Sequence, residues 1–251
     1  MKFDDFDIKM RKYEESLDQF IPQEDFMVAR LDGKGFTKLT KEDLPLKRPF
    51  DAHFKDALVN TMCWLMQADF QILYAYNESD EISLLFNKNA DIFNRKVRKF
   101  NSILAGEVSV KFSQEIGTRA VFDCRMIPLP DVEAVEDYFL WRQEDSHRNS
   151  INAHCYYALL NKGFTPNKAA AELSKKTIKE KLSFLNSCGI KFKNRPVWEV
   201  YGTGVSWQKV EKVGFNPVTK KKETALRRRP RILRSIPTGE EYRKFIRDLL
   251  V

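Results

Sequence analysis

The sequence lacks the features that mark membrane, secreted and zinc-dependent proteins. No apolar run in its 251 residues reaches the ~18 residues that a membrane-spanning helix requires. The N-terminal residues are acidic and have no signal-peptide core, so we expect neither secretion nor membrane insertion. The four cysteines are far apart in the chain and form no CxxC pair, which argues against a zinc knuckle or a redox dithiol. We therefore expect a cytoplasmic protein whose thiols are reduced.

Three common catalytic and nucleotide-binding motifs are also missing. The sequence contains no GxGxxG dinucleotide fingerprint, no GxxxxGK[ST] P-loop and no GxSxG nucleophile elbow. His147, His154 and Cys155 are close in sequence, but their spacing matches none of the ligand patterns of structural zinc sites. Any catalytic chemistry must therefore come from other residues.

What the chain does contain is a strongly basic segment toward its C-terminal end. The formal net charge is +8, and ten lysines and arginines stand against two glutamates between Lys209 and Arg234, so this segment accounts for the whole excess. Basic charge gathered on one side of a near-neutral body is typical of proteins that bind a polyanion such as nucleic acid. A solvated surface loop of the same composition is the alternative, and charge alone leaves both open.

Strand and helix patterns alternate in the first half of the chain. We predict strands at 26–31, 72–76, 82–86 and 119–125 and helices at 54–65 and 93–104, with Asp51 and Asp91 as N-caps and Pro128 and Pro130 ending the last strand. The order β-α-β-β-α-β is that of a ferredoxin-like α+β domain. In this topology the end of the first strand and the turn after the second lie at one edge of the sheet, so Asp32 and the turn at 79–81 should converge.

The second half of the chain has mostly helical patterns. We expect a helix that begins at Asp145 or Ser146 and carries His154 on its buried face, and one or two helices between 168 and 184. Residues from 198 through the basic segment resemble a β-hairpin, and 242–250 a terminal helix. We predict one compact unit, with a catalytic α/β part at 1–130 and a helical and hairpin part at 131–251.

Asp32, Asp80 and Glu81 form the acidic cluster that this topology predicts. Unpaired carboxylates repel one another unless a cation neutralises them, and oxygen-only ligands suit magnesium. Two such ions would favour phosphoryl transfer. The segment that follows Asp32, GKGFTK at 33–38, has the glycines and lysines of a phosphate-cradling loop. Simple turn residues are the alternative for both segments.

Three blocks of the sequence resemble the signature blocks of the tRNA(His) guanylyltransferase family: RLDGKGF at 30–36, SDE at 79–81 and YFLWRQ at 138–143. The stretch YGTGVSWQK at 201–209 resembles a late strand of that family. The resemblance implies a polymerase-palm catalytic domain with a helical appendage and a basic β-hairpin. It also implies addition of nucleotides to the 5′ end of tRNA in the 3′-to-5′ direction.

The resemblance implies a catalytic or nucleotide-binding role for each matching residue. Asp32 and Asp80 would bind two magnesium ions with the Gly33 carbonyl, and Glu81 would support the cluster. The nucleotide and its triphosphate would be held by Gly33, Lys34, Gly35, Phe36, Thr37, Ser79 and Asp80. Arg48, in the Arg-Pro pair that best matches a Lys-Pro motif of the family, would orient the triphosphate, with Lys47 as its substitute.

Contacts with tRNA are implied for a second set of residues: Arg142, His147, Asn149, Lys181, Arg227, Arg228 and Arg229. For Arg142 a carboxylate partner is the alternative to tRNA. The family also implies GTP and ATP as substrates and a homotetramer.

One block departs from the eukaryotic family members. They carry HINNLYN after the Trp-Arg-Gln block, whereas this chain has HRNSINA at 147–153, so that Ala153 replaces the final Asn. In the family that Asn assists adenylylation of a 5′-monophosphate. The departure resembles the bacterial and archaeal "like" branch, which is associated with template-dependent repair of 5′-truncated tRNA. We therefore predict a template-dependent 3′–5′ nucleotidyltransferase, with addition of G to tRNA(His) as the alternative and a nucleotide cyclase or a non-catalytic RNA-binding protein as more remote ones.

Overall fold

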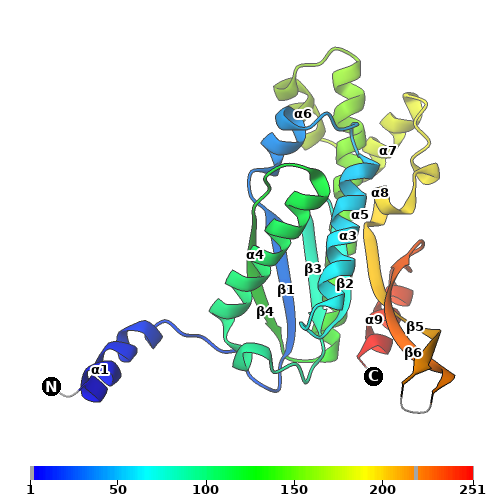
Figure 1. The fold of residues 1–251 in the computed structure, drawn as a ribbon. Helices are drawn as coiled ribbons and strands as arrows, with labels where there is room; N and C mark the ends of the chain where they lie inside the picture. The colour runs from blue at the N-terminus through cyan, green and yellow to red at the C-terminus, as the bar shows by residue number, and fades with distance from the viewer. Residues whose placement is uncertain (1–2, 218–219, 251) are drawn as a thin grey trace.

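One antiparallel sheet of six strands runs through the part of the chain that the computed structural model describes, residues 3–217 and 220–250. Its strand order is β4-β1-β3-β2-β5-β6 (Figure 1). The strands are β1 (Phe26–Gly33), β2 (Ile72–Glu78), β3 (Glu81–Phe86), β4 (Phe122–Leu129), β5 (Thr203–Asn216) and β6 (Lys221–Leu233). The first four strands and the two helices between them give the predicted ferredoxin-like order, with β3 between β1 and β2.

Two helices, α3 (Ala52–Gln67) and α4 (Val97–Ile116), cover one face of this sheet and enclose the larger apolar core. The predicted cap of α3 is confirmed, because the Asp51 carboxylate accepts a hydrogen bond of 3.0 Å from the Phe54 N–H. The predicted cap at Asp91 is wrong. A short 3₁₀ turn at Ile92–Arg95 intervenes, with Phe93 in a left-handed conformation, and α4 begins only at Val97.

The opposite face of the sheet packs against α5 (Val132–Asn161) and α9 (Glu240–Leu249), which enclose a second core. The expected helix start at Asp145 or Ser146 is wrong, because both residues lie inside α5. The N-cap of α5 is Asp131, whose carboxylate accepts from the Ala134 N–H at 2.8 Å. Polar residues of a cap type therefore lie in the middle of a long helix rather than at its start.

The far end of α5 carries a helical appendage made of α6 (Pro166–Ser174), α7 (Ile178–Ser187) and the short α8 (Val197–Tyr201) (Figure 1). The helices predicted between 168 and 184 are confirmed. The hairpin begins at Thr203 rather than at Trp198, and its strand β5 joins the sheet beside β2. Pro128 does not end β4; it lies within this edge strand, where the lack of a backbone N–H is tolerated.

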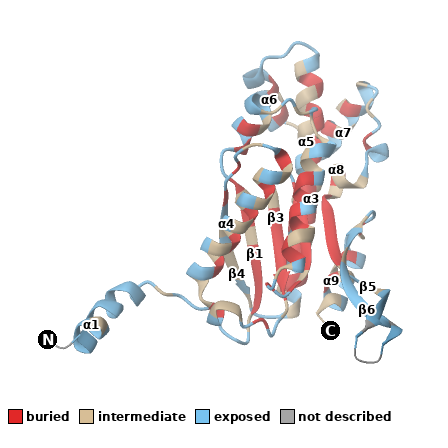
Figure 2. Cartoon of the chain, in the orientation of Figure 1, coloured by how far each residue is buried: buried red, intermediate tan, exposed pale blue. Residues whose placement is uncertain are grey.

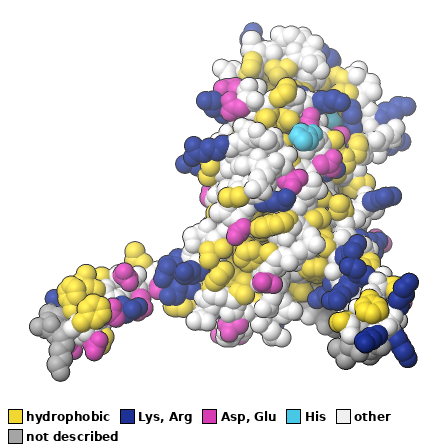
Figure 3. Space-filling model, viewed as in Figure 1, with side chains coloured by type: hydrophobic (Ala, Val, Ile, Leu, Met, Phe, Trp, Pro, Cys, Tyr) yellow, Lys and Arg dark blue, Asp and Glu magenta, His cyan; other side chains and the backbone are white. Residues whose placement is uncertain are grey.

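Two segments extend from the body of the molecule. The N-terminal helix α1 (Phe3–Glu15) has no buried residue and stands apart (Figures 1 and 2). The outer part of the β5–β6 hairpin is exposed on both strands, and Figure 3 shows lysine and arginine side chains gathered on it. Among the described residues, no helix has the length and apolar character needed to cross a membrane.

Candidate active site

Four carboxylates lie in one row across the sheet. In the strand register Glu78 pairs with Glu81, Glu81 pairs with Asp32, and Asp32 pairs with Asp123 on β4. Residues directly opposite one another in antiparallel strands place their side chains on the same face. The predicted convergence of Asp32 with the turn after β2 is thereby confirmed. Asp123 was missed, because its place in the row follows from the register between β4 and β1 and not from its being in a predicted strand.

Asp80 lies next to this row, in the two-residue turn between β2 and β3. Burial raises the pKa of its carboxyl group, and the negative charges of Asp32 and Glu81 raise it further, while a hydrogen bond from Ser79 lowers it. The Ser79 hydroxyl donates to Asp80 Oδ1 at 3.1 Å. Mutual repulsion among these carboxylates is the electrostatic condition that a bound cation relieves.

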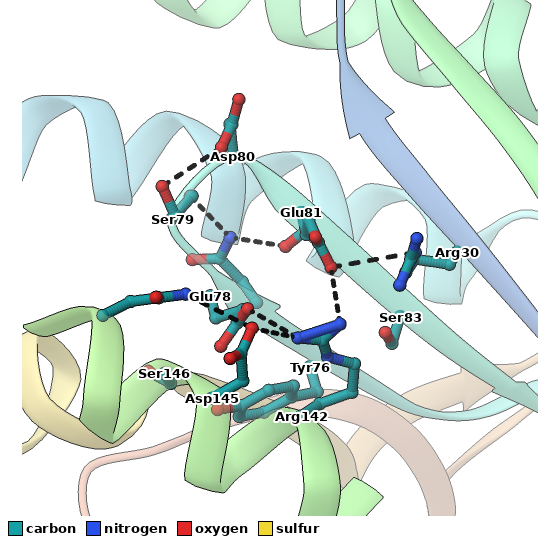
Figure 4. Close-up of polar contacts among 12 residues, drawn as sticks. Arg30, Tyr76, Glu78, Ser79, Asp80, Glu81, Ser83, Arg142, Asp145 and Ser146 are labelled. Carbon is teal, nitrogen blue, oxygen red and sulfur yellow. Dashed lines mark hydrogen bonds and ion pairs between the residues drawn. The ribbon is translucent and has the colours of Figure 1, made fainter. Parts of the chain in front are cut away.

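The turn itself is held by a buried amide. Ser79 has a φ of 50°, a left-handed conformation that costs an L-residue on the order of 1–3 kcal/mol. Asn77, 4% exposed, donates from Nδ2 to the carbonyls of Ser79 at 3.1 Å and of Glu81 at 2.9 Å. These bonds bridge the turn and fix the direction in which Asp80 leaves the sheet (Figure 4).

Arg142 of α5 clamps the two residues that flank this turn (Figure 4). Its Nη2 atom lies 3.1 Å from Glu78 Oε1 and 2.6 Å from Asp145 Oδ2, and its Nη1 atom lies 3.5 Å from Glu81 Oε2. Arg142 is only 2% exposed. Of the two roles left open for Arg142, the structure therefore shows the pairing with carboxylates.

Glu78 is the most strongly perturbed member of the row. Burial raises the pKa of its carboxyl group to about 8, although the guanidinium of Arg142 lowers it. Its second oxygen, Oε2, is buried without a hydrogen-bond partner among the described residues. Glu78 therefore belongs to the support of the turn, underneath the carboxylates that face outward.

The loop after β1 is shaped by an aromatic ring. Phe36 is 2% exposed and packs against Phe54, Phe112 and Phe122 in the larger core. A Cβ atom on Gly33 would lie 2.4 Å from the Phe36 ring, so only glycine fits at the end of β1. The side chain of Phe36 therefore belongs to the core, although the residue lies in the predicted nucleotide loop. Lys34 and Thr37 are exposed, and Gly35 adopts a φ of 73° at the start of the short helix α2 (Phe36–Lys38).

A pocket of about 300 Å³ lies beside the turn, between the N-terminus of α3, the middle of α5 and α8. Its wall includes Arg48, Lys47, Ser79, Asn149 and Ala153. The Arg48 guanidinium donates to the carbonyl of Thr40. Arg48, which we predicted to orient the triphosphate, therefore lines the same cavity as Ser79. Ala153, at which the sequence departs from the eukaryotic block, lines it too.

The residues predicted to contact tRNA are spread over the molecule. Arg227, Arg228 and Arg229 are exposed on β6, as expected for an electrostatic surface. His147 is half-buried and stacks on Tyr201. Lys181 is 9% exposed on the inner side of α7, so the structure does not place it on an open RNA-binding surface.

The acidic row has the character of an open magnesium site rather than of a preformed metal cage. Among the described residues, no three His, Cys, Asp or Glu side chains gather into a ready ligand group. Magnesium is commonly held by one or two carboxylates together with waters and substrate phosphates. Asp32 and Asp80 provide such an incomplete set of oxygen donors, whereas Glu81 Oε2, which lies near them, already faces the guanidinium of Arg142 at 3.5 Å.

Two segments of the chain match models of known protein families. Residues 7–130 match the family described as tRNAHis guanylyltransferase, and residues 133–236 match the Thg1 C terminal domain. The tRNA(His) guanylyltransferase of Schizosaccharomyces pombe is 31% identical over 207 residues, which cover 78% of this chain and 77% of that protein. The probable tRNA(His) guanylyltransferase of Mus musculus is 29% identical over 199 residues, which cover 75% of this chain and 66% of that protein.

Solved structures with the same fold span nearly the whole chain. A bacterial tRNA(His) guanylyltransferase-like protein in complex with GTP superimposes with a TM-score of 0.77 at 24% identity, over 98% of this chain and 99% of that one. The tRNA(His) guanylyltransferase of Saccharomyces cerevisiae superimposes with a TM-score of 0.69 at 24% identity, over 77% of this chain and 91% of that one.

Proposed function

Because the chain belongs to the tRNAHis guanylyltransferase family, a family of nucleotidyltransferases, we propose that it transfers nucleotides from nucleoside triphosphates to the 5′ end of tRNA. The observation that carries the proposal is the acidic row at the sheet edge. Asp32 lies directly opposite Glu81, and its charge raises the pKa of Asp80. The chain spans 66% of the mouse relative, so its activity and its substrates are stated here as proposals.

In the proposed reaction the 3′-hydroxyl of an incoming nucleoside triphosphate attacks an activated 5′-phosphate of the tRNA. The new bond joins that oxygen to the 5′-phosphorus, and pyrophosphate or AMP leaves. Asp32 and Asp80 would hold divalent cations, which would supply positive charge to stabilise the phosphate and to lower the pKa of the hydroxyl. Arg142, Glu78 and Asn77 keep the Ser79–Asp80 turn in place while this happens.

The cationic side chains at the mouth of the first pocket suit the triphosphate. Lys47 and Arg48 lie on its wall, opposite Ser79 and the middle of α5. The N–H groups of Gly35, Phe36 and Thr37 can add to these cations, because the first turn of a helix leaves its N–H groups without intrahelical partners, whereas the Lys34 N–H is already bonded to the Val121 carbonyl at 2.8 Å. GTP and ATP are the proposed nucleotides, since bacterial relatives of the same fold are described as complexes with each.

Two modes of addition fit this chemistry. The curated relatives are named tRNA(His) guanylyltransferases, which favours addition of a single G to tRNA(His) over the templated repair that we predicted from the sequence. Templated repair is supported by Ala153, which stands on the pocket wall in place of the family's Asn. The homotetramer implied by the resemblance stays a prediction, which sedimentation analysis tests.

One incorporation assay tests the transferase and separates the two modes. The protein is given a 5′-truncated tRNA and an intact tRNA(His), labelled nucleotides and magnesium. Label that enters as G irrespective of the opposite strand supports guanylyltransferase activity, whereas label that enters only where it pairs supports templated repair. Absence of label in the wild type, with RNA binding retained by Asp32→Ala, would leave a non-catalytic RNA-binding protein. Release of a 3′,5′-cyclic nucleotide without RNA would indicate a cyclase.

A further inference from the structure

A second and larger pocket lies behind the first, across α5 and α8. It has a volume of about 710 Å³, and its wall includes residues of α5, α7, α8 and the loop between α7 and α8. Helix α5 contributes Ser146 and Asn149 to the first pocket and His147 to the second. Helix α8 contributes Glu199 to the first and Tyr201 to the second. The two cavities therefore share their walls and lie side by side.

The charge of the second pocket is of one sign. Lys191, Lys193 and Arg195 line it, all three are exposed, and the wall includes no Asp or Glu among the residues that the structure describes. Within residues 3–217 and 220–250, none of these three cations forms an ion pair with a carboxylate. The charge of Arg195 opposes the rise in the pKa of the nearby Glu199, so Arg195 is partly compensated, but the pocket wall keeps a positive charge that attracts phosphate groups.

An aromatic platform forms the inner wall of this pocket. The rings of His147 and Tyr201 stack with centroids 5.2 Å apart and planes 9° from parallel, and Phe192 meets His147 edge-on at 5.9 Å. Burial lowers the pKa of His147, so its imidazole is neutral near pH 7. Neutral rings beside phosphate-binding cations are the combination with which proteins hold unpaired nucleotides, because bases stack on the rings.

The second pocket is connected to the carboxylate site by a hydrogen bond and by helix α5. The Tyr76 hydroxyl donates to the Tyr201 carbonyl at 2.7 Å, and Tyr76 belongs to β2, which leads directly into the turn with Asp80. Along α5, His147 follows Arg142 by five residues, a rise of about 7.5 Å. A polynucleotide whose 5′ end lies at Asp80 thus reaches this pocket within a few nucleotides.

We propose that the second pocket binds an unpaired stretch of the RNA substrate next to its reacting 5′ end. Its phosphates contact Lys191, Lys193 and Arg195, and one base packs against the His147–Tyr201 pair. The inference rests on the proposed function for the identity of the RNA, but the site itself is defined by its own geometry. It gives a role to four residues to which the sequence assigned none, and it gives His147 a defined place in RNA binding.

Binding of tRNA to matched triple variants tests this site. The test variant carries Lys191→Ala, Lys193→Ala and Arg195→Ala, and the control carries Lys168→Ala, Lys175→Ala and Lys179→Ala on exposed positions of α6, α7 and the loop between them. Both lose three positive charges, so long-range attraction falls equally. Fluorescence anisotropy over a salt series measures the affinity. The test variant should reduce the slope of log K against log salt by about 2 to 3, at about 0.7–0.9 for each lost phosphate contact, and the control by less than 1.

A crosslinking experiment locates the RNA independently of affinity. A 5′-truncated tRNA with a photoreactive base at each unpaired position opposite the missing nucleotides in turn should crosslink to the peptide that contains His147 or Tyr201, and Tyr201→Leu should abolish that crosslink. Equal loss of affinity in both triple variants, or crosslinks that map only elsewhere, would overturn the proposal. If affinity falls selectively in the test variant while the wild type incorporates no nucleotide, the RNA site stands and the proposed transferase activity fails.

Discussion

Asp32 on β1 and Glu81 on β3 are direct cross-strand partners, and Asp80 precedes Glu81 in the turn. The two strands that carry them are brought together by the sheet order β1-β3-β2, so three carboxylates meet at one sheet edge. Such an edge is unfavourable without a counter-charge, and the charges of Asp32 and Glu81 add to the rise in the pKa of Asp80 that burial causes.

Neutralising one carboxylate should separate activity from stability. Asp32→Asn and Asp80→Asn each remove a proposed cation ligand, so nucleotide incorporation should fall by at least about 100-fold. Because each variant also relieves repulsion, the midpoint of thermal unfolding should stay constant or rise. Asp56→Asn, at an exposed position of α3, is the control and should keep full activity. Retained incorporation in both site variants would contradict the assigned role.

Removing Arg142 should destabilise the protein strongly. The guanidinium is 2% exposed and contacts Glu78, Glu81 and Asp145, so Arg142→Ala leaves carboxylates buried without a partner, at a cost of about 3–5 kcal/mol. Adding Glu78→Gln to this variant should recover part of the loss. Urea denaturation measures both changes. Arg148→Ala, at an exposed position of the same helix, should change the free energy of unfolding by less than about 0.5 kcal/mol.

Two glycines of the predicted nucleotide loop should respond differently to alanine. Gly33→Ala drives a methyl group to 2.4 Å from the Phe36 ring and should cost about 1–3 kcal/mol. Gly35→Ala meets open space but must adopt a φ of 73°, at about 1–2 kcal/mol. A double-mutant cycle with Phe36→Ala distinguishes the two, because it should show coupling with Gly33 and none with Gly35. Additivity at Gly33 would show that the ring does not constrain the loop.

The topology of the site was predictable, whereas its support was not. Hydrophobic patterns and turn residues sufficed to place Asp32 beside Asp80, because strand order follows from the alternation of strands and helices. Arg142 and Glu78 are 64 positions apart, and only the packing of α5 on the sheet brings them together. No local pattern distinguishes an arginine that clamps a turn from one that binds RNA.

The wrong helix start at Asp145 or Ser146 has a physical origin, which is that polar residues serve tertiary contacts as well as helix ends. Asp145 has the chemistry of an N-cap, but in the folded chain its carboxylate accepts from Arg142 in the middle of α5. Phe36 lies in a glycine- and lysine-rich stretch, but its ring packs against Phe112 in the larger core, so only its backbone belongs to the predicted nucleotide loop. Asp123 was recognised as part of a strand, and only the register with Asp32 indicates its place in the acidic row.

Acidification should destabilise the protein through His154. This side chain is 3% exposed, and burial, with a smaller effect from the charge of Arg195, lowers the pKa of its imidazole to about 4. The unfolded chain binds the proton more readily than the folded one, so this contribution is complete above pH 6.5 and is lost as the pH falls through 4. The loss is on the order of 3 kcal/mol.

Comparison of variants isolates that contribution. Glu199, whose Oε2 lies 3.3 Å from His154 Nε2, has a pKa raised by burial and so contributes a pH dependence of opposite sign. The quantity to measure is therefore the difference in free energy of unfolding between the wild type and His154→Gln at pH 7 and at pH 4. That difference should shrink on acidification. An unchanged difference would contradict a neutral buried imidazole.

Restoring the family's asparagine at position 153 should change which 5′ end the protein accepts. Ala153 stands on the wall of the first pocket beside Asn149 and Ser150, whose hydroxyl is buried without a hydrogen-bond partner among the described residues. Ala153→Asn adds an amide to that wall at a helix-propensity cost of about 0.7 kcal/mol at most. We expect it to increase transfer of labelled AMP from ATP to a 5′-monophosphorylated tRNA, because an added amide donor near the pocket stabilises charge that develops on the phosphate. Addition to a 5′-triphosphorylated tRNA needs no such activation and should stay unchanged.

The control is Ala153→Leu, which adds a branched side chain without hydrogen-bonding groups and should increase neither reaction. Equal AMP transfer by the wild type and Ala153→Asn would remove the argument that this position favours templated repair over addition of G to tRNA(His).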